Sequence, residues 1–269
     1  MIHLQSVSLT TIPIATAGQF PFTVPVIKSL PDIRFTTPVT FLVGENGSGK
    51  STFLEAIANA AGSIAVGSNE LERDKTLESV RQLSKALKLT WTKKTRKGFF
   101  LRAEDYFGYA KRLARIREEL EQELREIDEE YKDRSTYAQG LAKMAHYGQL
   151  HALREKYSGD LDERSHGESF FTFFKARFVP EGLYLLDEPE APLSPIRQLA
   201  FLSMIKDMVA NHNAQFIIAT HSPILMAFPG AVILSFDQNP VNAVPYDDLE
   251  HVTLTRQFLN NPDSFLRHL

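Results

Sequence analysis

The sequence predicts an α/β fold built on a mainly parallel sheet, and three observations support this fold class. Short, nearly continuous apolar runs suit parallel strands that are covered on both faces; they occupy residues 39–43, 183–186, 215–219 and 231–236. Helical patterns follow several of these runs, for example at 51–60 and 196–211, and such alternation is typical of α/β domains. A glycine-rich loop joins the first strand to its helix.

Two regions depart from this alternation. Five prolines between residues 11 and 38 predict edge strands and loops of an N-terminal antiparallel lobe. Residues 105–131 contain no proline, and apolar residues recur there every three or four positions, which predicts an amphipathic helix. This stripe consists of Leu113, Ile116, Leu120, Leu124, Ile127 and Tyr131. With a second helical stretch at 137–156, we expect an inserted helical hairpin whose stripe packs on its neighbouring helix.

The loop at 44–52 (GENGSGKST) fits the phosphate-binding pattern G-x-x-x-x-G-K-[ST]. Its glycines let backbone N–H groups point at phosphate, and the following helix adds the positive end of its dipole. We expect Lys50 to reach the β- and γ-phosphates and the Ser51 hydroxyl to ligate Mg²⁺. The predicted contacts to a nucleoside triphosphate are Gly44, Glu45, Asn46, Gly47, Ser48, Gly49, Lys50, Ser51 and Thr52.

A pair of acids ends the predicted strand at 183–186. Asp187 and Glu188 follow four apolar residues, which places them at the carboxyl edge of the sheet beside the phosphate loop. We predict that Asp187 holds Mg²⁺, directly or through water, and that Glu188 is the general base for the attacking water. With Lys50 at the phosphates, these acids predict hydrolysis of the bound triphosphate.

The acid pair, followed by Pro189 and preceded by a phosphate loop, resembles the ATP-binding-cassette (ABC) class of ATPases. Residues 165–169 (SHGES) resemble the signature loop of that class. Ser165, the first of them, lies 22 residues before Asp187. Residues 190–194 (EAPLS) look like the loop that follows the catalytic acid. Residues 220–222 (THS) are similar to the switch-histidine region.

The resemblance implies roles for these residues. By this resemblance, the Ser165 hydroxyl and the Gly167 N–H would donate hydrogen bonds to the γ-phosphate of ATP held by the other subunit, and Glu168 belongs to the same loop. His221 contacts the γ-phosphate or the attacking water. The signature loop lies too far from its own Lys50 to close over the same nucleotide, so the resemblance implies a homodimer with two ATP molecules at its interface.

Within this class, the chain is similar to the soluble branch of SMC-like and RecF-like ATPases, which includes bacterial AAA-family predicted ATPases. The runs GENGSGKST, FFLRAE, SHGES and LLDEPEAPLSP carry this resemblance, which covers the chain from about Phe20 to His221. His166 stands where the wider class usually has glycine. Glu104 stands in the region of the Mg²⁺-contacting glutamine, where an ordinary strand end is the other interpretation.

The resemblance also implies cofactors and a domain organisation. ATP and Mg²⁺ are the expected cofactors. One composite ATPase domain would consist of residues 1–104 with the phosphate loop, a helical insert at 105–160 and residues 161–269 with the remaining motifs. Three aromatic residues are candidates for stacking on adenine: Phe20, Phe22 and Phe35. For each of them, packing in the hydrophobic core is the favoured interpretation.

Composition excludes several other classes of function. The 269 residues are 43% hydrophobic and 23% charged, as in globular proteins, and the absence of cysteine excludes disulfide scaffolds and cysteine nucleophiles. No apolar run approaches the roughly 20 residues of a membrane helix. The N-terminus lacks the pattern of a secretory signal. We therefore expect a cytoplasmic protein with no transmembrane segment of its own.

The net charge of −3 gives no overall basic footprint for a nucleic acid. A basic cluster nevertheless stands in one stretch: Lys85, Lys88, Lys93, Lys94, Arg96 and Lys97. Solvated surface is the plainer interpretation of these charges. Together with the branch resemblance, the basic cluster favours an ATP-driven clamp on DNA or a DNA-bound protein. Two alternatives stay open: a regulatory ATPase of a defence or toxin-type system with a separate effector, and the ATPase subunit of a membrane transporter.

Overall fold

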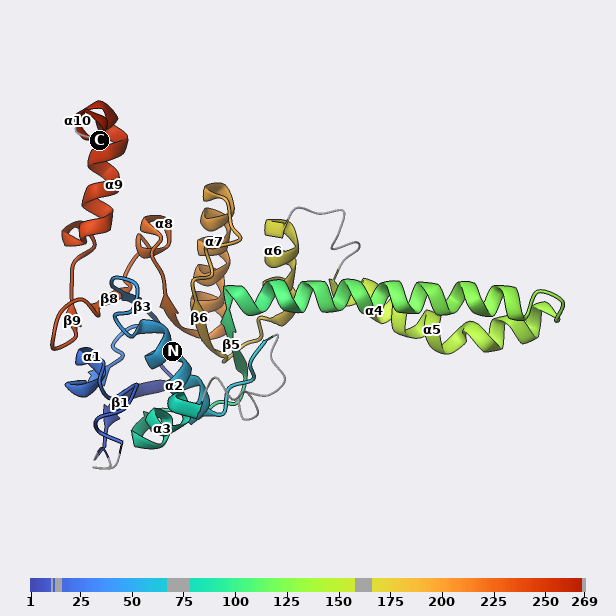
Figure 1. Cartoon of the computed structure of the whole chain (residues 1–269), viewed down its shortest axis with the longest axis horizontal. Helices are drawn as coiled ribbons and strands as arrows, with labels where there is room; N and C mark the ends of the chain where they lie inside the picture. Colours follow the sequence, from blue (N-terminus) through green and yellow to red (C-terminus); the bar gives the residue numbers. More distant parts are fainter. Residues whose placement is uncertain (11, 13–15, 67–77, 158–165, 268–269) are drawn as a thin grey trace. The chain divides into compact units, whose positions relative to one another are not determined.

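The computed structural model describes the chain except for residues 11, 13–15, 67–77, 158–165 and 268–269. Within helices, the side chains of residues 78, 107, 109–114, 145, 151–157 and 166–169 are also not described. The chain forms two compact units (Figure 1). The first unit joins Met1–Ala103 to Phe178–Leu269, and the second is Glu104–Arg177. The phosphate loop, the acid pair and the predicted switch histidine all belong to the first unit.

A six-stranded, mostly parallel sheet forms the centre of the first unit. In order across the sheet, its strands are β5 (Gly98–Arg102), β6 (Leu183–Asp187), β7 (Gln215–Ala219), β3 (Val39–Val43), β8 (Val232–Ser235) and β9 (Asn242–Ala243). Only β9 runs antiparallel to its neighbour. Every residue of β3, β6 and β7 is buried, as the continuous apolar runs predict. The predicted α/β P-loop fold with a mainly parallel sheet is confirmed.

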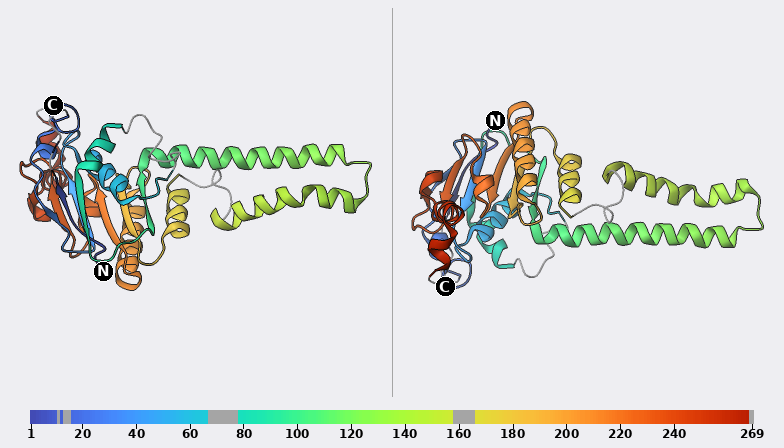
Figure 2. Two further views of the ribbon diagram at one scale, coloured as in Figure 1. Left: turned by 90° about the horizontal axis from the view of Figure 1, so that it is seen from below. Right: turned by 90° about the horizontal axis from the view of Figure 1, so that it is seen from above.

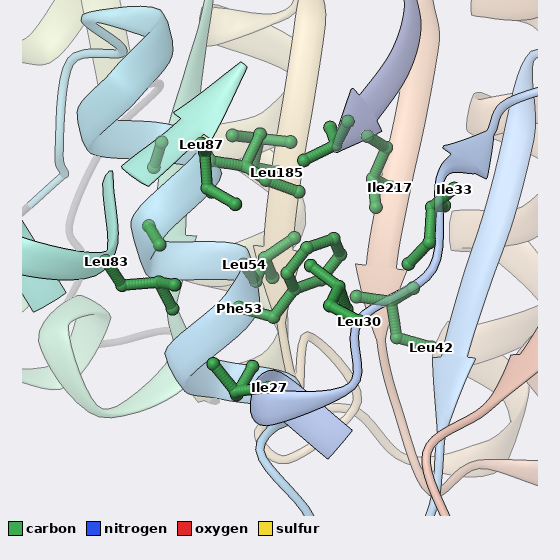
Figure 3. Packing of buried hydrophobic residues seen from close by; sticks show 14 of the residues in the cluster. Ile27, Leu30, Ile33, Leu42, Phe53, Leu54, Leu83, Leu87, Leu185 and Ile217 are labelled. Carbon is green, nitrogen blue, oxygen red and sulfur yellow. The ribbon is translucent and has the colours of Figure 1, made fainter. Parts of the chain in front are cut away.

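One face of this sheet is covered by α2 (Lys50–Ala61), the helix that follows the phosphate loop. Phe53 of α2 lies in one buried cluster with Leu42, Leu185 and Ile217, which come from three adjacent strands (Figure 3). Side chains alternate across a strand, so the neighbours of these residues point to the opposite face. Packing of α2 therefore holds the phosphate loop directly against the sheet.

The opposite face carries aromatic side chains. Tyr184 and Phe216 pair across β6 and β7, and their rings stack with centroids 4.9 Å apart. Phe178 meets Phe216 edge to face at 5.5 Å and lies 6.5 Å from Phe201 of α7 (Pro195–His212). This aromatic layer packs α7 on the sheet, so both faces are covered.

A second, antiparallel sheet of β2 (Ile33–Arg34), β1 (Leu4–Leu9) and β4 (Leu87–Trp91) completes the N-terminal lobe. The buried side chain of Gln215 joins it to the parallel sheet. Its Oε1 accepts the N–H groups of His3 and Leu4, each at 2.8 Å, and its Nε2 donates to the Leu4 carbonyl at 3.0 Å. A buried amide with three hydrogen bonds fixes the two sheets together.

Among its described residues, the proline-rich stretch 11–38 contributes only β2 to this antiparallel sheet. The other strands come from its flanks, since β1 precedes the stretch and β4 follows α3 (Glu78–Ala86). Proline has no N–H to donate to a strand ladder, which agrees with this distribution. Within the stretch, Pro25 starts the short helix α1 (Pro25–Lys28).

The C-terminal part of the first unit leaves the sheet in short elements. A single helical turn, α8 (Pro223–Met226), follows β7, and η2 (Tyr246–Asp248) follows β9. The chain ends with α9 (Glu250–Asn260) and α10 (Pro262–Leu266). No helix in the described part of the chain is both long and apolar enough to cross a membrane.

The second unit consists of α4 (Ala103–Glu130), α5 (Thr136–Tyr157) and α6 (His166–Arg177). The helices α4 and α5 form a hairpin and lie side by side in both views of Figure 2. Leu120 and Leu124 of α4 are buried together with Leu150 of α5, so this part of the apolar stripe packs on the neighbouring helix as predicted. Ile116 of the stripe is 36% exposed, so the prediction does not hold for that residue.

Candidate active site

Three parallel strands end at one edge of the sheet and bring the predicted motifs together. The phosphate loop follows β3, Asp187 ends β6, and Thr220 follows β7. Leu42 and Asp187 both pair with Ala219, which lies between them in the sheet. The N–H of Glu188 donates to the Ala219 carbonyl at 2.9 Å, and the N–H of Thr220 donates to the Leu42 carbonyl at 3.2 Å. Backbone pairing thus sets the spacing of the motifs.

Glycine conformation gives the phosphate loop its curl. Gly44, Gly47 and Gly49 have φ values of 147°, 83° and 101°, in the region that favours glycine. Gly44 also needs its missing side chain for space, because a Cβ there would lie 2.9 Å from both Asp237 Oδ1 and Ser48 Oγ. Among the described atoms, Ser48 Oγ is buried without a hydrogen-bond partner. Its hydroxyl is therefore available to a phosphate oxygen.

Lys50 is only 5% exposed although it carries an ammonium group. Its Nζ donates to the carbonyls of Gly44 at 2.6 Å and Glu45 at 2.9 Å. Burial lowers the pKa of Lys50, because it disfavours the charged form. Four carboxylates oppose this pKa shift: Asp237, Asp187, Glu188 and Glu45. The loop thus holds a desolvated ammonium where phosphate groups would arrive.

Ser51 and Asp187 meet across the loop and the end of β6. The Ser51 hydroxyl donates to Asp187 Oδ1 at 3.2 Å. Burial raises the pKa of Asp187 to about 7, and the nearby charges of Glu188 and Glu55 act in the same direction. The hydrogen bond from Ser51 and the charge of Lys50 lower it. A bound cation would favour the ionised carboxylate.

The Ser51–Asp187 pair fits Mg²⁺, the metal ion that the sequence implies. Mg²⁺ prefers oxygen ligands and is usually held by one or two carboxylates together with substrate phosphates. The described residues contain no group of three or more acidic, histidine or cysteine side chains that could hold a metal by themselves. Phosphate and water oxygens would have to supply the other ligands, which suits a metal that binds with the nucleotide.

Glu188 and His221 lie at the same sheet edge, and both side chains are partly exposed to solvent. Glu188 has a φ of 50°, a left-handed conformation that is uncommon for residues other than glycine and clusters at functional sites. Its Oε1 lies 3.9 Å from Nε2 of His221, too far for a direct hydrogen bond. Nε2 of His221 is buried and has no hydrogen-bond partner among the described residues. A small ligand between these two groups could contact both.

Glu190 supports this pair, a function that sequence analysis did not assign to it. Its Oε1 accepts the backbone N–H of His221 at 2.8 Å, and its carboxylate also accepts a hydrogen bond from Thr220. Burial raises the pKa of Glu190, while these hydrogen bonds lower it. The proximity of Glu190 to Glu188 in the chain could have indicated a place in the site, but its partners in the loop after β7 could not be foreseen.

Two further residues at this edge were also missed. Asp237 Oδ1 accepts the N–H of Glu45 at 2.6 Å, so it braces the start of the phosphate loop. It follows the apolar run 231–236 as Asp187 follows its own strand, and this pattern could have pointed to it. His251, near the start of α9, has its ring centroid 6.2 Å from that of His221. We find no sequence signal that could have indicated His251.

Four predicted site residues are not brought to this edge by the first unit. Ser165 lies outside the described residues, and Gly167 and Glu168 lie in α6 of the second unit. Glu104 also belongs to the second unit. Its neighbour in the FFLRAE run, Arg102, ends β5 and pairs with Glu55 of α2 at 3.0 Å.

The aromatic candidates for adenine stacking divide into two groups. Phe22 is 1% exposed and Phe35 is 3% exposed, and both belong to the main core cluster. Core packing, the favoured interpretation, is therefore confirmed for these two. Core packing is wrong for Phe20, which is 52% exposed, so its ring is accessible.

Comparisons with known proteins give one family match and several structural likenesses. Residues 26–76 match the protein-family model described as an AAA domain. No curated protein sequence matches the chain. The inward-facing structure of a putative metal-chelate type ABC transporter is 18% identical, covers 96% of this chain and 89% of its own, and has a TM-score of 0.45.

Two further solved structures are similar to this chain. CbiO1 from Clostridium perfringens, part of the ABC transporter complex cbiONQ, is 12% identical over 100% of both chains, with a TM-score of 0.46. The SMC head domain from Thermotoga maritima is 16% identical over 91% of this chain and 99% of its own, with a TM-score of 0.41. These low identities and TM-scores carry no function over to this chain. The AAA-domain match contains the phosphate loop, so the family model and the loop motif agree on this part of the chain.

Proposed function

We propose that this chain binds ATP with Mg²⁺ and hydrolyses it at the edge formed by β3, β6 and β7. The observation that carries the proposal is the convergence of the phosphate loop, the Ser51–Asp187 pair and the Glu188–His221 pair on one sheet edge. Each group supplies a different requirement of phosphoryl transfer: phosphate binding, a metal site and a base for water.

Each residue has a distinct role in this reaction. Lys50 and the loop N–H groups bind the β- and γ-phosphates, which positions the terminal phosphorus for attack. Ser51 and Asp187 would hold Mg²⁺, which neutralises charge that develops on the phosphate oxygens. Glu188 accepts the proton of the attacking water, and His221 donates from Nε2 to that water or to the γ-phosphate.

We further propose that the chain works as an ATP-sandwich dimer of the ABC type. The support is the resemblance of residues 165–169 to a signature loop, whose partner in this class is the nucleotide of another subunit. ATP would then make charge-assisted hydrogen bonds to both subunits, and the dimer would be tightest before hydrolysis. Loss of the γ-phosphate would release the two faces.

Light scattering on a Glu188→Gln variant tests the dimer. This variant should bind ATP without cleaving it, so it should be dimeric with saturating Mg-ATP and monomeric with Mg-ADP. Lys50→Ala is the matched control and should be monomeric with either nucleotide. A Glu188→Gln protein that binds ATP, shown by equilibrium dialysis, yet stays monomeric would contradict the sandwich.

We propose DNA, or a protein bound to DNA, as the partner of this ATPase. The support is the basic cluster, whose six side chains are all exposed. One acid from elsewhere in the chain reduces its charge, since Glu181 pairs with Lys93 and Lys97. These hydrogen bonds lower the pKa of Glu181, which therefore stays ionised. Lys94 and Arg96 lie beside this ion-paired group and do not take part in it.

Salt dependence tests the DNA proposal. Phosphate contacts release counterions, so DNA stimulation of the ATPase should fall steeply with salt. The Lys94→Ala/Arg96→Ala double variant should make the plot of log affinity for DNA against log salt concentration less steep, by the equivalent of about two phosphate contacts. A Lys28→Ala/Lys206→Ala variant removes the same charge from exposed positions outside the basic cluster and should leave the slope unchanged. Equal slopes for all three proteins would exclude the basic cluster as a DNA contact.

A further inference from the structure

The segment after β9 brings a histidine back to the candidate active site. Three residues around His251 fix this segment: one through a hydrogen bond and two through burial of their side chains. The Tyr246 hydroxyl donates to the carbonyl of Pro223 in α8 at 3.0 Å. Leu249 and Val252 are 5% and 2% exposed, so both residues anchor the start of α9 in the protein. His251 stands between these two anchors and is only partly exposed.

The ring of His251 lies beside that of His221. Their centroids are 6.2 Å apart and their planes meet at 53°. Nε2 of each ring is buried, and within the described part of the chain neither nitrogen has a hydrogen-bond partner. Two neighbouring imidazole nitrogens thus lack a hydrogen-bond partner among the described residues.

Two of the charged groups that act on His251, Lys50 and Glu45, belong to the phosphate loop. Burial lowers the pKa of His251, and so do the charges of His221 and Lys50, while Asp237 and Glu45 raise it. The imidazole is therefore held towards its neutral form, in which one ring nitrogen still donates a hydrogen bond.

A buried polar atom normally has a hydrogen-bond partner, so unpartnered atoms at a site suggest a ligand. The partner that Nε2 of His251 lacks must lie beside His221 and, in the tautomer with hydrogen on Nε2, must accept a hydrogen bond. A phosphate oxygen meets both conditions. The γ-phosphate is the part of a triphosphate that His221 and Glu188 address, which makes it the nearest candidate.

We propose that His251 is a second nucleotide-sensing histidine, whose Nε2–H donates to the terminal phosphate of a bound nucleoside triphosphate beside His221. This inference rests on the proposed function, since it presumes ATP in the phosphate loop. Its consequence is that α9 begins at the nucleotide, so the C-terminal helices respond to the presence of the γ-phosphate. ADP, which lacks that phosphate, makes no contact with His251.

Affinities for fluorescent ATP and ADP analogues, measured with Mg²⁺ in the Glu188→Gln background, test this assignment. His251→Ala should weaken ATP binding about 10-fold or more, as expected for a lost hydrogen bond to a charged group, and should change ADP binding less than about twofold. His251→Gln keeps an N–H donor near the position of Nε2 and should recover most of the ATP affinity. His212→Ala is the control, because this partly exposed histidine ends α7 and pairs with Asp207 of the same helix.

The outcomes separate this inference from the proposed function. Equal losses of ATP and ADP affinity in His251→Ala would overturn it, because a merely structural histidine would disturb the whole site. Unchanged ATP affinity would also overturn it, provided that the melting temperature shows a folded protein. If the protein with His251 intact binds neither nucleotide, the proposed function itself fails, and this inference fails with it.

Discussion

The backbone N–H of His221 donates to Glu190 Oε1 over 2.8 Å, so an acid that follows β6 fixes the loop that follows β7. That loop carries the imidazole whose Nε2 lies 3.9 Å from Glu188 Oε1. The separation of the proposed general base from the proposed switch histidine therefore depends on a third carboxylate. In our proposal, Glu190 contacts neither water nor phosphate and acts by positioning.

Removal of the Glu190 carboxylate should slow turnover more than it weakens binding. In Glu190→Ala, we expect kcat to fall about 10-fold, since loss of a buried hydrogen-bond partner costs about 1–3 kcal/mol. The affinity for ATP should change little. Glu190→Gln keeps an acceptor oxygen for the His221 N–H and should retain more activity than the alanine variant. Steady-state kinetics that show the same kcat for both variants would argue against positioning through this hydrogen bond.

Replacement of Lys50 should separate nucleotide binding from stability. Lys50→Met keeps most of the side-chain volume and removes a desolvated ammonium, so the melting temperature without nucleotide should change by only a few degrees. ATP affinity should nevertheless fall by at least about 100-fold, since a charged contact to phosphate is lost. Calorimetric titration and thermal melting measure the two quantities. Lys28→Met, at an exposed position in α1, should bind ATP normally.

Two glycines of the phosphate loop should differ in their tolerance of alanine. Gly47→Ala meets open space and should cost about 1 kcal/mol of unfolding free energy through its φ of 83°. Gly44→Ala adds a clash, because its Cβ would lie 2.9 Å from the Asp237 oxygen that accepts the Glu45 N–H. We expect a cost of at least about 2 kcal/mol for Gly44→Ala in denaturant titrations. Equal costs at the two positions would show that Asp237 moves away freely.

Asp187 should make the nucleotide-free protein less stable as the pH rises. Its pKa is about 7 in the folded protein, against 3.8 as the ordinary value. Between these pH values the folded state binds more protons than the unfolded chain, so stability falls as the pH rises from about 4 to about 7. Asp187→Asn cannot ionise and should be more stable than the wild type at pH 8, by about 1–3 kcal/mol.

The test compares the melting temperatures of Asp187→Asn and the wild type without Mg²⁺ or nucleotide. The difference should be small at pH 4.5 and should favour the variant by several degrees at pH 8. A difference that does not change with pH would mean that Asp187 keeps an ordinary pKa. Wild-type protein at pH 8 should also gain stability from Mg-ATP, whereas the variant should gain less, because it lacks the carboxylate for Mg²⁺.

Local patterns predicted the parallel sheet well. The four runs named in the sequence correspond to β3, β6, β7 and β8, because buried parallel strands need continuous apolar side chains. The strands of the antiparallel sheet were less visible. Residues 87–91 and 33–34 gain their strand pairing from β1, which is distant in sequence, and a short local pattern carries little of that information.

The sequence by itself determined the phosphate loop, the acid pair after β6 and the histidine after β7, because each is a local motif at the end of an apolar strand. Only the tertiary structure decided which other groups meet them. Glu190 reaches His221 across the ends of adjacent strands, Asp237 reaches Glu45 from the loop after β8, and His251 returns to His221 from the start of α9. These contacts depend on strand order and burial, which bring together residues whose separation along the chain gives no sign of contact.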